Sequence, residues 1–144
     1  MEMVTTGRVV VPATIENLHD LLNVHSGQRQ PERVRSVEIP DALVDTGAMV
    51  LLLPKRLIGQ LGLIRLRTKQ TRTSAGFVEF GMYAPVRLTV QGRDCDVEVA
   101  EVPDNCPVLI GQIPLELLDF LIDPVNHRLI GNPDHGGEHM MDMF

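Results

Sequence analysis

A single acidic residue, Asp45, lies in the apolar segment ALVDTGAMVLLLP, residues 42–54. A carboxylate among apolar residues costs free energy unless it is paired or protonated, so we expect this one to have a function. Thr46 offers a hydroxyl that donates and accepts hydrogen bonds, and Gly47 lets a ligand or another backbone approach closely. The three residues predict a carboxylate displayed on a tight turn after a strand. An ordinary surface turn is the alternative, and the apolar residues on both sides argue against it.

The composition restricts the class of protein. The chain has 144 residues and a formal net charge of -6, which suits one domain with its own core, residues 1–144. The Lys and Arg residues do not gather in one run, so we expect no nucleic-acid partner. No apolar run has the length of a membrane span, and no export signal is evident; both predict a soluble, cytoplasmic protein without a membrane partner. Cys95 and Cys106 are too few for a disulfide framework and are expected to be reduced.

Alternation of apolar and polar residues dominates the sequence and predicts an all-β fold class with one to three short helices. The predicted strands cover residues 7–15, 37–44, 78–83, 86–90, 95–99 and 127–130. The predicted helices cover residues 18–26, which Gly27 stops, 54–61, which Gly62 ends, and 114–120. Small or polar turn sequences separate the later strands at residues 73–76, 91–94 and 123–126.

Three features follow one another along the chain: an apolar strand that ends in Asp-Thr-Gly-Ala, a later hairpin, and the sequence VLIG, residues 108–111, at the start of a short helix. In this order they resemble the retropepsin-like aspartic proteases of the single-domain, retroviral type, over about residues 37–130. The resemblance implies a half-barrel that is active as a two-fold homodimer. It divides the chain into an N-terminal strand with a helical insertion (7–36), a protease core (37–130) and a C-terminal tail (131–144), which is a candidate dimer strand.

The same resemblance implies the chemistry. Asp45 of each copy would activate a water for peptide hydrolysis, because the reaction needs two carboxylates and the chain has one Asp-Thr-Gly. Thr46 would hydrogen-bond across the two-fold axis, and Gly47 would lie against the substrate backbone. The implied partners are a second copy and a peptide or protein substrate, and no cofactor or metal is implied. The further residues that would bind substrate are Ala48 and Met49, which follow Asp-Thr-Gly, and Ser74, Ala75 and Gly76. The last three would form the tip of the flap, a hairpin that closes over the substrate in this family.

Two positions depart from the retroviral pattern. The retroviral enzymes carry an acidic residue after Asp-Thr-Gly-Ala and an Arg after the later apolar-apolar-Gly, and the two form an ion pair. Met49 and Gln112 occupy these positions here, so both halves of the pair are replaced together. We expect residues 108–111 to pack beneath the acid loop as scaffold. The segment 16–30 has no retroviral counterpart.

Two other functions stay open on the sequence. The segment HGGEH places His135, Glu138 and His139 at the spacing of a zinc peptidase, but that motif needs a helix and its two glycines are poor helix formers. The second alternative is a dimeric peptide-binding module of the same fold without catalysis. The intact Asp-Thr-Gly favours catalysis over it, because two adjoining carboxylates are costly to a module that only binds.

Overall fold

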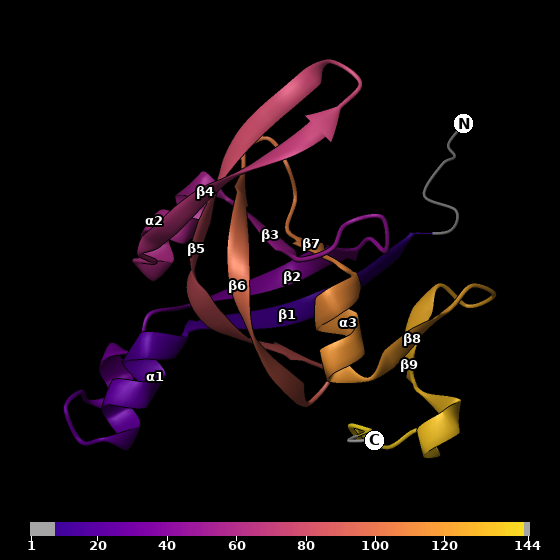
Figure 1. Ribbon diagram of the computed structural model, residues 1–144. Coiled ribbons are helices and arrows are strands. Elements are labelled where there is room, and N and C mark those ends of the chain that lie inside the picture. The colour runs from indigo at the N-terminus through magenta and orange to yellow at the C-terminus, as the bar shows by residue number, and fades with distance from the viewer. Residues whose placement is uncertain (1–7, 143–144) are drawn as a thin grey trace.

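The computed structural model describes residues 8–142, and the regular structure of this range is mostly β (Figure 1). The expected mostly β chain with one to three short helices is confirmed. The strands are β1 (Val9–Asn17), β2 (Ser36–Val44), β3 (Leu51–Pro54), β4 (Arg65–Thr73), β5 (Gly76–Val90), β6 (Arg93–Val102), β7 (Leu109–Ile110), β8 (Phe120–Asp123) and β9 (Arg128–Gly131). The helices are α1 (Leu18–His25), α2 (Lys55–Leu61) and α3 (Gln112–Leu118), with 3-10 turns at Pro31–Arg33 and Pro133–His135.

A closed ring of strands forms the body of the molecule. The main sheet has the order β1-β2-β7-β3-β6-β5-β4, and β1 also pairs with β5, so that every strand of this sheet except β4 belongs to the ring. Along β1 every second residue from Val9 to Asn17 is buried, because successive side chains point to opposite faces of a strand. The interior of the ring holds the core, in which Ile15, Leu51 and Leu88 are fully buried.

Three neighbouring strands of the ring bring together two segments that are distant in the sequence. β7 is two residues long and lies between β2, to which it is parallel, and β3, to which it is antiparallel. Val44, the last residue of β2, pairs with Ile110, the last residue of β7. The residues that follow these strands, Asp45 and Gly111, are therefore neighbours. The parallel pairing of β2 with β7 brings together the two motifs, which are about sixty residues apart in the sequence.

The hairpin formed by β4 and the first half of β5, residues 65–83, projects from the ring (Figure 1). We call it the projecting hairpin. All nine residues of β4 are exposed, and β5 becomes buried from Gly81 onward. A bulge between Tyr83 and Val86 bends β5, whose second half pairs with both β6 and β1. One strand thus belongs to the hairpin at one end and to the core at the other.

The insertion between β1 and β2 is tied to the body by a buried acid. Asn17 caps α1 by accepting a hydrogen bond from the Asp20 N–H at 3.0 Å. The Asp20 carboxylate is fully buried and accepts bonds of 2.8 to 3.0 Å from the backbone N–H, Nε and Nη2 of Arg35. The Arg35 side-chain hydrogen bonds lower the pKa of Asp20 to about 2. The same guanidinium lies against Gly62, where a Cβ would be 2.0 Å from Nη1.

Several predicted elements are wrong in their extent. No strand is predicted where β4 lies, because its residues RLRTKQTRT are almost all polar and show no apolar alternation. It divides β5 into two strands at Ala84 and Pro85, where the structure has the bulge. Pro54 is the last residue of β3, not the first of α2, and α3 begins two residues before Pro114. Gly7, the start of the first predicted strand, lies outside the described residues.

The C-terminal part forms a separate two-stranded sheet of β8 and β9, followed by a 3-10 turn and an irregular tail. Residues 138–142 of the candidate tail strand are not in a strand, and Met143 and Phe144 lie outside the described residues. Among the helices of residues 8–142, none combines the length and the apolar character that crossing a membrane requires.

Candidate active site

Asp45 is the first residue after β2 and begins the acid loop, residues 45–50. The strands on both sides are buried, with Val44 at 7% and Leu51 at 0% exposure, but the Asp45 side chain is partly exposed. The expected turn after a strand is therefore present, and it lies at the surface of the described chain although the strands on both sides are buried. Thr46 is exposed beside it, and its hydroxyl makes no hydrogen bond within residues 8–142. The apolar strands determine where the loop leaves the core, and the loop carries the acid to the surface.

Backbone hydrogen bonds hold the acid loop in place. The Asp45 N–H donates to the Ile110 carbonyl at 2.9 Å, and the Ala48 N–H donates to the Asp45 carbonyl at 3.1 Å. The Gly47 N–H donates to Oδ1 of Asp45 at 2.9 Å, which orients the carboxylate. The other oxygen, Oδ2, accepts no hydrogen bond within the described part of the chain, so a ligand can use it.

Gly111, the residue after β7, packs against the backbone of the acid loop, and a larger side chain would not fit at this position. Its N–H donates to the Val50 carbonyl at 3.0 Å, and the next N–H, of Gln112, donates to the Ala48 carbonyl at 2.8 Å. A Cβ at position 111 would lie 2.4 Å from the Val50 oxygen and 2.6 Å from the Ala48 oxygen. Closely packed backbones therefore require glycine at this point.

Met49 and Gln112, the two uncharged positions noted in the sequence, lie where the acid loop meets the start of α3. The Ile113 N–H donates to the Met49 carbonyl at 2.9 Å. The Met49 side chain is 63% exposed, and the Gln112 amide donates to Glu116 at 3.1 Å, within its own helix. The acid loop and α3 are thus held together with an uncharged side chain at both positions.

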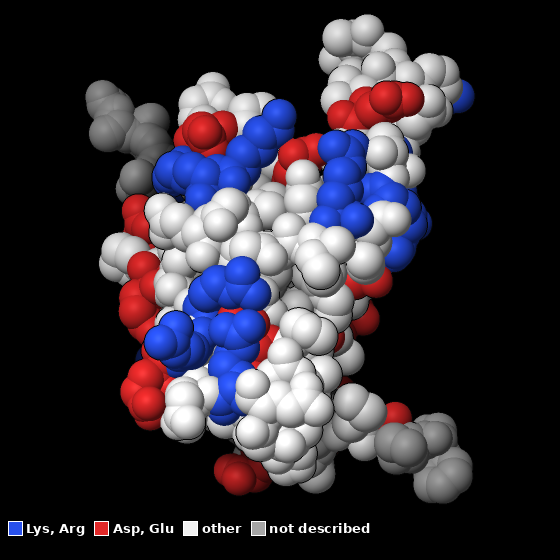
Figure 2. All heavy atoms as spheres, turned by 90° about the vertical axis from the view of Figure 1, so that its left-hand side faces the viewer, with Lys and Arg blue, Asp and Glu red and all other residues white. Residues whose placement is uncertain are grey.

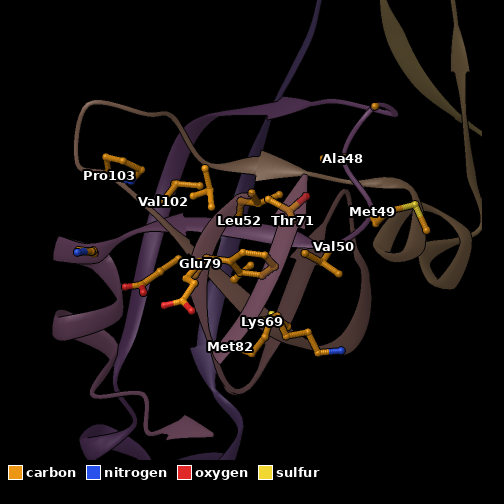
Figure 3. A pocket seen from close by; sticks show the side chains of 16 residues that line it. Ala48, Met49, Val50, Leu52, Lys69, Thr71, Glu79, Met82, Val102 and Pro103 are labelled. Carbon is orange, nitrogen blue, oxygen red and sulfur yellow. The ribbon is translucent and has the colours of Figure 1, made fainter. Parts of the chain in front are cut away.

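A cleft of about 630 Å³ lies between the acid loop and the projecting hairpin (Figure 3). Such a volume is within the range of ligand-binding pockets, about 300–1,000 Å³. Figure 3 shows that side chains of the acid loop, β3, β4, β5 and the end of β6 converge on it. Its lining is mostly apolar and consists of Gly47, Ala48, Met49, Val50, Leu52, Lys55, Lys69, Thr71, Val78, Glu79, Phe80, Met82, Ala100, Glu101, Val102 and Pro103.

Glu101 fastens the base of the projecting hairpin to the ring. Its carboxylate accepts a hydrogen bond from the Gly81 N–H at 2.8 Å and one from the Tyr83 hydroxyl at 3.2 Å. Burial and the charge of Glu101 raise the pKa of Tyr83, so its hydroxyl remains a donor at neutral pH. These two bonds hold the base of the hairpin against β6.

The predicted flap-tip residues lie where the projecting hairpin turns. Ser74 and Ala75 form the turn, and Gly76 begins β5 with a left-handed φ of 112°. The Thr73 hydroxyl accepts from the Ala75 N–H at 3.2 Å and donates to the Gly76 carbonyl at 2.9 Å. Of the predicted site residues, Gly47, Ala48 and Met49 line the cleft of the described chain. Asp45 and Thr46 lie beside this lining in the same loop, and none of the three tip residues reaches it.

The HGGEH segment does not form the helix that a zinc peptidase needs. His135 ends a 3-10 turn, and Gly136 and Gly137 adopt left-handed φ values of 66° and 79°. His139 hydrogen-bonds the Leu117 carbonyl at 3.0 Å, away from the contacts of His135. Among the described residues no group of three His, Cys, Asp or Glu side chains is arranged to hold a metal ion. The geometry of the segment therefore argues against the zinc alternative.

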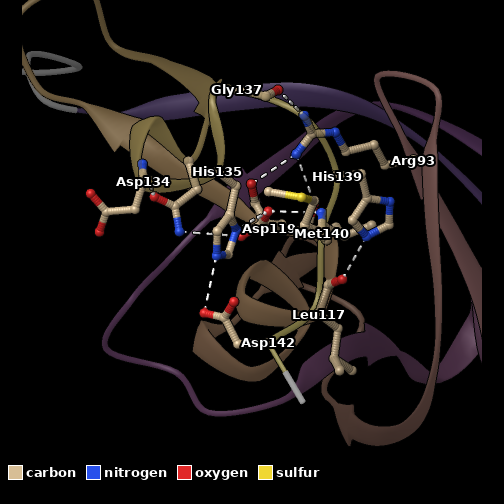
Figure 4. Close-up of polar contacts among 11 residues, drawn as sticks. Arg93, Leu117, Asp119, Asp134, His135, Gly137, His139, Met140 and Asp142 are labelled. Carbon is tan, nitrogen blue, oxygen red and sulfur yellow. Dashed lines mark hydrogen bonds and ion pairs between the residues drawn. The ribbon is translucent and has the colours of Figure 1, made fainter. Parts of the chain in front are cut away.

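His135 instead joins the tail to the end of α3 (Figure 4). Its Nδ1 lies 2.6 Å from Oδ2 of Asp119, and its Nε2 lies 3.1 Å from Asp142. The Met140 N–H donates to the same Asp119 oxygen at 3.0 Å. The hydrogen bond with His135 lowers the pKa of Asp119 to about 2, and the bonds with Asp119 and Asp142 raise the pKa of His135. This network is a structural contact of the tail.

The cysteines have no catalytic arrangement. Cys95 and Cys106 are both free thiols. Burial raises the pKa of Cys95 to about 12, so its thiolate is not formed at neutral pH. Cys95 acts as a small core residue, as the sequence analysis expects for the cysteines.

Sequence reasoning identifies the acid loop and misses most of the cleft. The alternation of Val78, Phe80 and Met82 reveals a shared face, but alternation does not say what that face covers. Lys69 and Glu101 give no signal at all, because one lies in a strand that was not predicted and the other contacts residues of a different strand.

In comparisons with known proteins, no protein-family model matches the sequence, and no curated protein matches it.

Proposed function

We propose that the protein is an aspartic endopeptidase of the retropepsin-like type, active as a two-fold homodimer in which each copy supplies Asp45. One observation carries the proposal. Asp45 follows the paired ends of β2 and β7, and one oxygen of its carboxylate accepts a hydrogen bond from the Gly47 N–H. The next residues of the same loop line a mostly apolar cleft that the projecting hairpin borders.

The dimer follows from the reaction. Hydrolysis by an activated water needs one carboxylate that accepts a proton and one acid that donates a proton, and two carboxylates about 3 Å apart share a single proton. A two-fold axis beside Asp45 provides the second group in the same geometry. The exposed Thr46 hydroxyl is free within the described chain to bond across that axis.

In the proposed reaction the ionised carboxylate takes a proton from a water, whose oxygen attacks the carbonyl carbon of the peptide. The protonated carboxyl gives its proton to the carbonyl oxygen, which produces a tetrahedral diol. When the C–N bond breaks, one carboxyl protonates the leaving nitrogen and the other takes a proton from the diol, so the shared proton is restored. No covalent bond to the protein forms. The projecting hairpin closes over the peptide and excludes bulk water.

Cleavage of a mixed peptide library by the purified protein tests this function. The assay runs from pH about 4 to 7.5, where a pair of coupled carboxyls holds one proton, and over a series of protein concentrations. We expect cleavage that rises faster than linearly with protein at low concentration and that a pepstatin-type inhibitor blocks. Asp45→Asn removes it, and Asp41→Asn, which changes an exposed acid of β2, retains it.

Three results would contradict the proposal. Cleavage that survives in Asp45→Asn would place the chemistry elsewhere. Cleavage that a chelator abolishes would indicate a metal-dependent enzyme. Binding of library peptides by a dimer that cuts none of them would identify the peptide-binding module instead.

A further inference from the structure

The projecting hairpin is basic although the protein is acidic. Residues 65–83 contain four basic residues and one acidic residue, a formal charge of +3, in a chain of net charge -6. The remainder, with nine basic and 18 acidic residues, carries -9. Figure 2 shows separate patches of Lys and Arg side chains on the face that carries α1, α2 and the hairpin, with Asp and Glu side chains between them. The element that borders the cleft thus differs in charge from the body beneath it.

Lys69 is the basic residue of the hairpin that faces the cleft. It pairs across the strands with Phe80, and Thr71 pairs with Val78. All four residues line the cleft, so they define the inner face of the hairpin. Lys69 is exposed and forms no ion pair within residues 8–142. Its ammonium group is therefore available to a ligand in the cleft.

The other basic residues of the hairpin are engaged elsewhere. Arg67 forms an ion pair with Glu98 of β6, and Arg65 donates to a threonine hydroxyl of its own strand at 2.8 Å. Arg72 pairs with Phe77 on the outer face, where its guanidinium lies 5.3 Å from the ring centre. Lys69 and Arg72 thus carry the same charge on opposite faces of one strand.

The acids of the cleft do not neutralise Lys69. The Glu101 carboxylate accepts the hydrogen bonds from Gly81 and Tyr83 at the base of the hairpin. Glu79 also lines the cleft, and its carboxylate lies 3.4 Å from the amide of Gln70, its partner across the strands. An unpaired cation beside apolar walls favours a ligand that offers an anionic group next to an apolar one.

We propose that the cleft selects extended polypeptides in which an acidic side chain lies close to a bulky apolar one, and that Lys69 contacts the acid. This inference rests on the proposed function, because it takes the ligand of the cleft to be a peptide. The apolar side chain packs against residues such as Leu52, Met82 and Val102, and the carboxylate pairs with Lys69. The +3 charge of the hairpin also attracts acidic segments from solution.

The test uses pairs of peptides, taken from cleaved library members, that differ only by Asp against Asn or Glu against Gln beside the apolar residue. The ratio of kcat/KM within each pair is measured for the wild type, Lys69→Gln, Lys69→Glu and Arg72→Gln. We expect the wild type to prefer the acidic peptide roughly fivefold, the value of an exposed ion pair. Lys69→Gln removes the preference, Lys69→Glu reverses it, and Arg72→Gln, with the same loss of charge on the outer face, retains it.

The result also separates this inference from the proposed function. If the acid-to-amide ratio of kcat/KM is the same in the wild type and in Lys69→Gln, Lys69 does not contact the acid. If Lys69→Gln and Arg72→Gln lower this ratio equally, the preference arises from the overall positive charge of the hairpin. If the protein cuts no peptide, fluorescence anisotropy with labelled acidic and amide library peptides measures the same ratio as binding. A preference for acid that depends on Lys69 then supports the inference while the protease proposal fails.

Discussion

Asp20 and Asp45 are both acids beside apolar sequence, and the fold treats them in opposite ways. Asp20 is 0% exposed, and its carboxylate accepts hydrogen bonds from three nitrogens of Arg35. Asp45 is partly exposed, and within the described chain its carboxylate accepts one bond, from the Gly47 N–H. The first acid is fully compensated and has no capacity left for a ligand.

The difference shows how a fold can place an acid for chemistry. Asp20 is positioned by its own charge, through the guanidinium of Arg35. Asp45 is positioned by backbone bonds of the acid loop to β7 and α3, which involve no charged side chain. Its carboxylate therefore has a defined position without being neutralised. Variants at Asp45, at Asp20 and at Gly111, which supports the acid loop, test whether the two acids are positioned in these different ways.

The largest expected effect is on activity at Asp45. Asp45→Asn should lower kcat/KM for library peptides by at least about 10³-fold, because one member of the proposed pair can no longer exchange a proton. Its free energy of unfolding should change by no more than about 0.5 kcal/mol, since a partly exposed side chain with one hydrogen bond contributes little. Parallel cleavage assays and urea unfolding at pH 7 measure both. A large loss of stability would mean that Asp45 is structural, like Asp20.

The next largest effect is on stability, at Asp20. Asp20→Asn should cost about 2–3 kcal/mol at pH 7, because a buried hydrogen-bonded charge is replaced by an amide that cannot accept all the bonds from Arg35. Activity per folded molecule should be unchanged. Asp41→Asn, at an exposed position, is the control.

The cost of Asp20→Asn also has a predicted pH dependence. The folded pKa of Asp20, about 2, lies below the ordinary 3.8. The stability that its ionisation provides is therefore complete above about pH 4 and is lost as the pH falls towards 2. Urea unfolding at several pH values should show the difference between wild type and variant shrinking over this range. A difference that is constant with pH would mean that packing, not charge, dominates.

The third effect tests the support of the acid loop. Gly111→Ala should cost about 2 kcal/mol and reduce cleavage, because its Cβ would overlap the carbonyl oxygens of Val50 and Ala48 and push the loop away from β7. Gly59→Ala in α2 is the matched control, since its Cβ meets nothing within 4 Å. It should leave activity unchanged and raise stability by about 0.5–1 kcal/mol, because alanine is the better helix former. Equal behaviour of the two variants would show that the close approach at Gly111 has no energetic consequence.

The local elements of the acid loop could be predicted from sequence, and its support could not. The apolar residues before Asp45 predict the strand that ends there, and the turn chemistry of Thr46 and Gly47 predicts the loop, but no strand is predicted where β3 follows the loop. The pairing of Val44 with Ile110 joins positions far apart in the chain, and no local pattern encodes such a contact. The expectation that residues 108–111 pack beneath the acid loop comes from a resemblance to a family and not from a local pattern.

The projecting hairpin shows where pattern reasoning fails. β4 lies outside the core on both faces, so its sequence is under no demand to alternate, and its strand character depends on pairing with β5. The side chains that face the cleft from this strand, including Lys69, could not be assigned before the pairing was known. Asp20 is a related case: it lies in a helix with ordinary amphipathic spacing, and only the return of the chain at Arg35 reveals that it is buried.

The smallest expected effect concerns a third acid, Asp119, which is compensated by a titratable partner. Its carboxylate contacts the His135 imidazole at 2.6 Å and accepts a hydrogen bond from the Met140 N–H at 3.0 Å. Asp119 thus joins the C-terminal tail to the end of α3. The contact with Asp119 and that with Asp142 raise the pKa of His135 above 6.5, and the contact with His135 lowers the pKa of Asp119 to about 2. The pair therefore differs from Asp20 and Arg35 in being sensitive to pH near neutrality.

A raised pKa of His135 means that the folded protein binds this proton more tightly than the unfolded chain does. The stabilisation is complete below about pH 6.5 and is lost as the pH rises through the folded pKa. The thermal midpoint of the wild type should therefore fall between pH 6 and 9 by more than that of His135→Gln, in which the amide keeps a hydrogen bond without the charge. Differential scanning fluorimetry across this range measures the two slopes, and NMR titration of His135 gives its pKa directly. Identical slopes in the two proteins would show that the charge of His135 does not stabilise the fold, and Asp119 would then belong with Asp45, an acid positioned without an ionic partner.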